Sequence, residues 1–311
     1  MNMNISNTDK KSINQLVSAF SCANTSERHR YSSWEFCYGL SMCMHERLLN
    51  GEVLTTNDYD YMALNLGFYL ASWGMLRNSF LLDCSYKIHL NPVEVILGKK
   101  SLWQDRIDAT TLLNFYESLY GAYGYKDKKE SRVSDTLFTK ILLGMTGNVV
   151  AYDKYCKEAL NLLLPDEVYD LFRDKGESWK EICSELHFFD ATFSELEYKP
   201  GYRKYMYSDG HYCMNDETVE YPTVKLIDMF LFNLGWLRVT LAKLVSSSVT
   251  EKTKKKYRGI LKKLVENGVE KENTFVEKIV SKDNLDRKIV AAEFAEAGKI
   301  SKEESEKVFT K

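Results

Sequence analysis

Apolar residues recur at helical spacing along most of the chain. Between Asn57 and Arg77 the large apolar positions follow intervals of three and four residues, which is typical of one helix face packed on a core. These positions are Tyr59, Met62, Leu66, Tyr69 and Trp73. The segment from Thr223 to Val245 is apolar nearly all round, which predicts a central buried helix. The pattern predicts a mostly α, multi-helix globular protein.

Helix-start signals agree with this fold class. The tetrapeptide 91–94 combines an N-cap Asn91, a proline at the first helical position and a capping-box Glu94, so a helix should run from there to Gly98. A second capping box at Ser178 to Glu181 predicts another helix. All four prolines stand where segments begin or turn, as expected for a helical chain.

One region departs from helical spacing. The sequence GYRKYMYSDGHYC, residues 201–213, places tyrosines around Asp209 and Gly210, a dipeptide suited to a tight hairpin turn. We expect a small β-hairpin here, inserted between helices.

The end of the chain differs in charge from the rest. From Ser246 onward, 16 Lys and Arg face 12 Asp and Glu, so this segment carries +4 while the whole chain carries −2. We therefore expect a helical core domain over residues 1–247 and a charged, polar helical appendage over 248–311. Within it Lys254, Lys255 and Lys256 could contact DNA phosphates, although a solvated helix face is the commoner meaning of such a run.

Composition narrows the class of protein. Hydrophobic residues make up 44% and charged residues 28% of the chain, enough apolar surface for a full core. The seven cysteines show no paired CxxC spacing, so we expect neither disulfides nor zinc, and a cytoplasmic location. The apolar run from Leu226 to Leu237 is shorter than the ~20 residues that a bilayer requires. We therefore expect no membrane partner. Phosphate-binding glycine loops of the ATP or dinucleotide type are absent, so we expect no cofactor.

Candidate chemistry lies between Thr136 and Cys156. An apolar helix carrying Lys140 runs into Gly144 and Gly147, and a second segment beginning near Asn148 carries Asp153. A tight helical hairpin would bring this lysine and carboxylate to one cleft. The alternatives are that the glycines only end a helix, that the lysine lies at the surface, and that the carboxylate pairs with a buried arginine such as Arg77.

This stretch, with the segment Tyr221 to Asp228, resembles the helix-hairpin-helix DNA glycosylase superfamily. In that family a glycine-containing hairpin grips the DNA backbone, and an aspartate just beyond it assists departure of a flipped base. The resemblance implies that Asp153 is the catalytic aspartate and that Gly144, Thr146 and Gly147 belong to the DNA-binding hairpin. Thr146 stands where the family has a second glycine, and the lysine precedes the hairpin, so we assign that lysine no nucleophilic role.

Aromatic residues complete the site that the resemblance implies. Tyr152, Tyr155 and Tyr207 are candidates for stacking on a base, and Trp73 is a further candidate pocket wall. Two hypotheses follow. The chain is a DNA-associated helical protein, a diverged base-excision glycosylase. Alternatively, it is a non-catalytic α-helical interaction or scaffold protein whose tail docks a protein partner and whose tyrosines are structural.

Overall fold

The computed structural model describes residues 7–22, 29–77, 79–104, 107–127, 129–166, 169 and 190–309. Its helices are α1 (Asn7–Cys22), α2 (Ser32–Leu49), α3 (Thr56–Ser72), α4 (Leu90–Gly98), α5 (Ala109–Ala122), α6 (Asp135–Met145), α7 (Lys154–Leu163), α10 (Asp190–Ser194), α11 (Thr223–Val245), α12 (Glu251–Glu266), α13 (Thr274–Lys282) and α14 (Arg287–Phe309). Strands β1 (Gly201–Ser208) and β2 (His211–Glu220) form an antiparallel pair. The mostly α fold and the small hairpin are confirmed. The helix expected to open at Ser178 lies outside the described residues.

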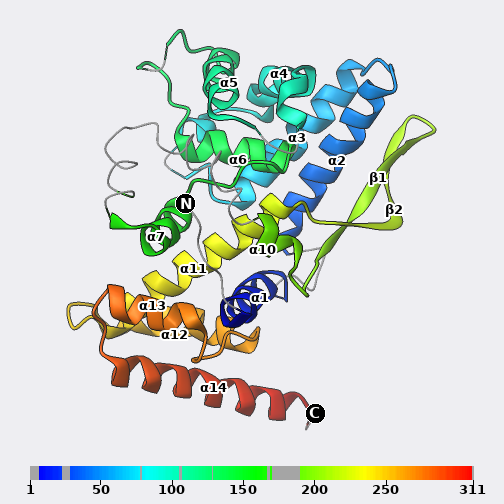
Figure 1. The fold of residues 1–311 in the computed structure, drawn as a ribbon. Helices are drawn as coiled ribbons and strands as arrows, with labels where there is room; N and C mark the ends of the chain where they lie inside the picture. Colours follow the sequence, from blue (N-terminus) through cyan, green and yellow to red (C-terminus); the bar gives the residue numbers. More distant parts are fainter. Residues whose placement is uncertain are drawn as a thin grey trace.

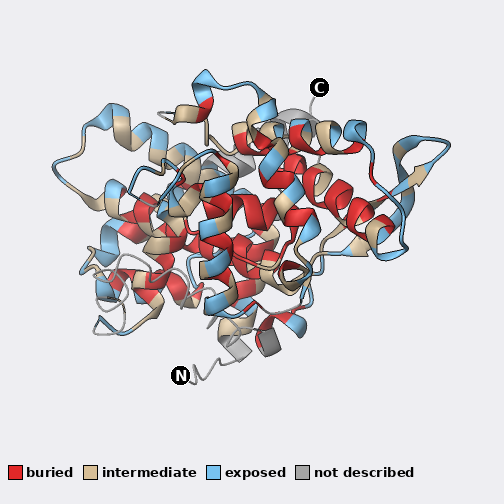
Figure 2. Ribbon diagram, turned by 90° about the horizontal axis from the view of Figure 1, so that it is seen from above, coloured by how far each residue is buried: buried red, intermediate tan, exposed pale blue. Residues whose placement is uncertain are grey.

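Helix α11 is the centre of the fold. It runs between a group formed by α2 to α6 and a second group formed by α1 and α12 to α14 (Figure 1). It packs against α1, α7 and α12, and most of its side chains are buried, as its all-round apolar sequence predicts. Buried residues gather in these central helices and exposed residues at the periphery (Figure 2). Helix α11 has 23 residues, but it is not apolar enough over a sufficient length to cross a membrane. The same holds for the other helices in the described ranges.

Two helix starts show how local signals and context combine. A capping box between Thr55 and Asp58 begins α3. Of its predicted apolar face, Met62, Leu66 and Tyr69 are buried, whereas Tyr59 and Trp73, the C-cap residue, are half-buried. The start predicted for α4 is wrong by a few residues, because α4 begins at Leu90 and the tetrapeptide 91–94 lies inside it. The 3-10 turn Tyr86–His89 leads directly into α4 and puts His89 at the N-cap. The helix ends at Gly98, as predicted.

The hairpin projects from one side of the molecule and is fastened to α2 and α3. Asp209 and Gly210 form its turn with φ of 52° and 79°, the left-handed backbone that this dipeptide suits. The Arg47 guanidinium lies 3.6 Å from the ring centroid of Tyr207 and bonds the Asp58 carboxylate at 3.1 Å. Tyr212 on β2 donates its hydroxyl to the same carboxylate at 2.7 Å. The hairpin tyrosines therefore hold the ribbon to the core.

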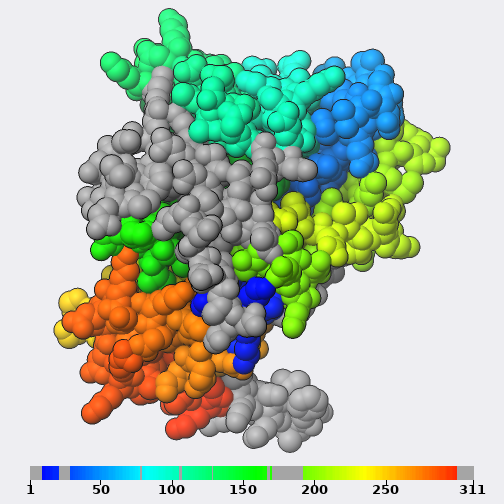
Figure 3. All heavy atoms as spheres, in the orientation of Figure 1, coloured from blue at the N-terminus to red at the C-terminus, as the bar shows by residue number. Residues whose placement is uncertain are grey.

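The C-terminal helices pack against the core. Helices α12 to α14 contact α1 and α11, and they form a block on the opposite side of the molecule from α4 and α5 (Figure 3). Arg238 of α11 makes two hydrogen bonds to Asp283, with Nε to Oδ2 at 2.8 Å. Asn273 donates to the Ser12 carbonyl at 3.0 Å. The appendage expected from residue 248 is helical, and polar contacts connect it to the rest of the protein.

Candidate functional site

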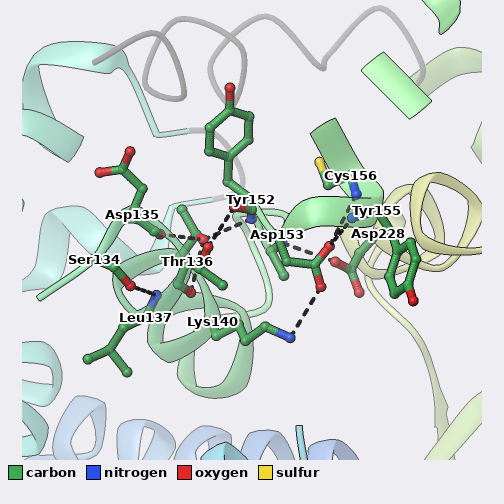
Figure 4. Close-up of polar contacts among 12 residues, drawn as sticks. Ser134, Asp135, Thr136, Leu137, Lys140, Tyr152, Asp153, Tyr155, Cys156 and Asp228 are labelled. Carbon is green, nitrogen blue, oxygen red and sulfur yellow. Dashed lines mark hydrogen bonds and ion pairs between the residues drawn. The ribbon is translucent and has the colours of Figure 1, made fainter. Parts of the chain in front are cut away.

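Helices α6 and α7, joined by the connecting segment 146–153, carry the residues of the predicted site (Figure 4). Ser134 caps α6 by accepting from the Leu137 amide at 3.2 Å. Asp153 caps α7, because its Oδ1 accepts from the amides of Tyr155 at 2.9 Å and Cys156 at 3.1 Å. The second helix therefore begins at Lys154, and the start expected near Asn148 is wrong.

The segment that precedes α7 is held in place by side chains of two other helices. Asp228 of α11 accepts from the Ala151 amide at 3.0 Å. Thr139 of α6 accepts from the Tyr152 amide at 2.8 Å. Because these two buried amides donate to side-chain acceptors, the backbone here does not have to be helical to satisfy its hydrogen-bond donors. The position of Asp153 follows from this fixed turn.

Lys140 and Asp153 meet, as their placement on either side of the turn predicts. The ammonium nitrogen lies 3.3 Å from Oδ2 of the carboxylate, and the two side chains are 6% and 15% exposed. A pair so removed from water is screened little by solvent or salt. The hypothesis that a buried arginine pairs with Asp153 is wrong, because a lysine takes that place.

A second buried pair lies on α11. Lys225 Nζ donates to Asp228 Oδ2 at 2.8 Å, and these side chains are 3% and 10% exposed. The other oxygen of Asp228 binds the turn before α7, so this pair adjoins the first one. The resemblance drew attention to this stretch but assigned these residues no role. A lysine and an aspartate three positions apart at the start of an otherwise apolar helix were the available signal.

Aromatic rings lie beside both ammonium groups. The ring centroid of Trp73 lies 5.2 Å from Lys140 Nζ and 5.9 Å from Lys225 Nζ. Lys225 also lies 4.9 Å from the ring of Trp34 and 5.2 Å from that of Phe20. Such cation–π contacts are worth about 2 kcal/mol when desolvated. Trp73, predicted as a pocket wall, is the ring shared by the two lysines.

The two glycines of the predicted hairpin are buried and serve close packing. A Cβ on Gly144 would lie 2.5 Å from the ring of Tyr69, and one on Gly147 would lie 2.7 Å from that of Tyr38. Gly147 also has a φ of +68°, the left-handed conformation common just after a helix end. Burial and then the charge of Asp228 raise the pKa of Tyr69 well above its usual value, so a neutral phenol lies against Gly144.

The hairpin does not offer the surface that the resemblance implied. The amides of Thr146 and Gly147 donate to the Leu142 carbonyl at 2.8 and 3.3 Å, and the Thr146 hydroxyl donates to the same oxygen at 2.9 Å. All of Gly144, Thr146 and Gly147 are buried. The expectation that these three residues grip a DNA backbone is therefore corrected, because a turn enclosed by aromatic rings cannot reach a phosphate.

The three candidate stacking tyrosines lie in different surroundings. Tyr152 is 6% exposed, and its ring points away from the ion pair (Figure 4). Tyr207 on β1 is covered by the guanidinium of Arg47. Tyr155 is half-buried, two residues beyond the capping carboxylate, with its ring edge-to-face on Phe232 at 5.0 Å. Of the three rings, that of Tyr155 is the one close enough to Asp153 for the carboxylate charge to help raise its pKa, although burial raises that pKa most.

The lysine run lies on α12. Lys255 and Lys256 are exposed and Lys254 is half-buried, so these side chains are accessible from solvent. This placement suits both a phosphate-binding face and an ordinary solvated helix face.

Within the described ranges, no group of three or more His, Cys, Asp or Glu side chains is placed to hold a metal ion. Comparison of the chain with protein-family models, with curated proteins and with solved structures found no match.

Proposed function

We propose that this chain is a DNA-associated protein of the base-excision type, with Asp153 as its catalytic carboxylate. The observation that carries the proposal is the buried Lys140–Asp153 pair, which connects α6 to the start of α7 and lies beside the ring of Trp73. A fixed carboxylate in a partly dry site can stabilise the positive charge that develops as a flipped base leaves its sugar.

The two oxygens of Asp153 have separate partners. Oδ1 accepts from the first amides of α7, and Oδ2 faces Lys140. As the bond between base and sugar breaks, positive charge develops on the sugar, and a fixed carboxylate with little surrounding water stabilises that charge strongly. Lys140 positions the carboxylate, and the half-buried ring of Tyr155 offers a face on which an extruded base can stack.

Binding of the DNA backbone falls to α12, because the α6–α7 turn is enclosed. Lys254, Lys255 and Lys256 provide the accessible positive charge for this role. Replacing all three with glutamine should reduce the slope of log affinity against log salt by about 0.9 for each phosphate that the variant no longer neutralises. An unchanged slope would remove α12 from the DNA interface.

The test is incubation of the purified protein with duplex and single-stranded DNA carrying a panel of modified bases, scored for alkali-labile strand breaks. Asp153→Asn is the informative variant, because asparagine is also a good N-cap and removes only the charge. Asp108→Asn is the matched control, since Asp108 caps α5 by accepting from the Thr111 amide at 2.9 Å. We expect breaks with the wild type and Asp108→Asn, and none with Asp153→Asn.

Two results would contradict the proposal. Breaks that persist in Asp153→Asn would show that this carboxylate is not catalytic. An absence of breaks on every substrate would overturn base excision and leave the interaction-protein hypothesis, in which the buried ion pairs are structural.

A further inference from the structure

Helix α3 presents large apolar side chains to solvent. Its other sides pack against α2, α4, α6 and the 3-10 turn Tyr86–His89. On the outer side, Tyr61, Leu64 and Phe68 are 39%, 48% and 59% exposed. Spacings of three and four residues place these side chains in one stripe along the helix. Large apolar side chains gathered on a surface mark a site of contact with another molecule.

The charge of this surface restricts the kind of partner. The stripe continues with residues that are polar but uncharged, namely Asn57, Asn65 and Ser72. The two acidic residues of α3 have partners of their own, because Asp58 is buried against Arg47 and Asp60 accepts from the Tyr86 hydroxyl at 2.8 Å. Charged residues are depleted and aromatic residues enriched at the centres of protein interfaces. The surface therefore suits another protein surface without charge rather than a nucleic acid or a charged peptide.

The order of the residues in the stripe is nearly the same in both directions. About a midpoint between Leu64 and Asn65, the aromatic Tyr61 corresponds to the aromatic Phe68, and the polar Asn57 corresponds to the polar Ser72. In an antiparallel pair of such helices about a twofold axis, each residue meets its counterpart, so Tyr61 meets the partner's Phe68. A twofold interface requires this kind of self-complementary surface.

We propose that the α3 face, formed by residues 57, 61, 64, 65, 68 and 72, binds a second copy of this chain as an antiparallel helix pair. Asn65 lies near the axis of this pair. Its Nδ2 donates to the Tyr61 carbonyl at 2.9 Å, which holds the side chain against its own helix. An amide has both donors and an acceptor, so Asn65 can bond the partner's Asn65. A polar residue near the axis of a helix pair fixes its register.

The hairpin supports one edge of the α3 face. The ring of Tyr61 stacks on that of Tyr212 with centroids 5.8 Å apart, so Tyr61 is ordered before the second copy binds and loses less entropy on binding. Met214, two residues further along β2 and 37% exposed, extends the apolar surface. One helix face supplies only part of the ~800 Å² per partner that a standard interface buries, so we expect a weak dimer with a dissociation constant in the micromolar range.

Sedimentation equilibrium of the whole protein at about 1–200 μM tests the proposal, because this range brackets a micromolar dissociation constant. We expect the mass to rise from monomer to dimer with concentration. Leu64→Glu, at an exposed position beside the axis, should raise the dissociation constant at least about 30-fold, as loss of a central interface residue does. Ile289→Glu is the matched control, because Ile289 is 39% exposed on α14, in the C-terminal block, and its replacement should leave the dimer unchanged.

Cross-linking tests the same contact without a new charge. Cys84 and Cys213 are exposed, so both are first replaced with serine to give a parent protein. Leu64→Cys in this parent should give a covalent dimer with a short bismaleimide, whereas Ile289→Cys and the parent itself should not. The cross-link also decides the question if Leu64→Glu does not fold.

Three results would overturn the inference. A monomer at every concentration would show that the α3 face does not bind its own copy. A dimer that Leu64→Glu leaves unchanged would lie on another surface. Growth beyond the dimer would exclude a closed twofold pair. None of these outcomes depends on strand breaks in DNA, so the proposed function is tested separately.

Discussion

Gly144, in the last turn of α6, gives the sharpest test of why glycine stands just before the α6–α7 connection. Alanine inside a helix is ordinarily more stable than glycine by roughly 0.5–1 kcal/mol. Here the new methyl group would lie 2.5 and 2.7 Å from two ring atoms of Tyr69, a side chain only 2% exposed and unable to move aside. Overpacking of this kind costs about 1–3 kcal/mol. Gly144→Ala should therefore lower the free energy of unfolding by about 1–2 kcal/mol.

Urea denaturation followed by circular dichroism measures this change, and Gly259→Ala is the matched control. Gly259 lies inside α12, is exposed, and has no atom within 4 Å of the position of an added Cβ. Its replacement should raise the free energy of unfolding by the full helix preference, roughly 0.5–1 kcal/mol. If Gly144→Ala stabilises the protein as Gly259→Ala does, then Tyr69 does not enforce glycine and the packing account of the turn is wrong.

Three further predictions concern stability. Gly235→Ala should lower the free energy of unfolding, measured by urea denaturation, by more than about 3 kcal/mol, because the new Cβ would lie 1.9 Å from the carbonyl oxygen of Tyr155, a backbone atom. A smaller loss would show that α7 and α11 can move apart. Burial lowers the pKa of His89 from 6.5 to about 4. The neutral imidazole therefore contributes fully to the free energy of unfolding above pH 6.5, and this contribution should fall by about 3 kcal/mol as the pH drops to 4. His89→Gln should flatten this pH dependence in urea denaturation, and an unchanged pH profile would refute the prediction. Asp153→Ala should lower the free energy of unfolding by about 3 kcal/mol or more, because it removes a helix cap and leaves Lys140 buried without its partner. Asp153→Asn keeps the cap, so it should lower the free energy of unfolding by clearly less. Equal losses in the two variants would exclude a capping contribution.

Much of the fold is readable in the sequence where local signals are strong. The limits predicted for α11 match, because its apolar composition leaves a buried helix as its only stable form. The Asp209 turn was predictable because few dipeptides tolerate two successive left-handed residues. The start of α4 was not predictable, because the preceding 3-10 turn extends the helix towards the N-terminus, beyond the predicted cap at Asn91. The start of α7 was missed because distant Asp228 holds the chain out of helical conformation before it.

The candidate site was half predictable. Lys140 and Asp153 were expected to meet because a glycine turn lies between them. Lys225 was not assigned to the site, because its arrival there depends on how α11 packs against α7 and the segment before it, which local spacing does not encode. The glycines of the turn were interpreted as exposed because the sequence does not reveal that Tyr38 and Tyr69 close over them.

The central position of α11 has a consequence for cooperativity. Near its start Asp228 holds the turn of the candidate site, at its middle Asn233 donates to the Leu16 carbonyl of α1, and near its end Arg238 binds Asp283 after α13. One helix thus connects the ion pairs to α1 and to the end of α13 through direct hydrogen bonds. The two ends of the molecule should gain and lose order together, so amide exchange at the site reports on contacts at the other end of α11.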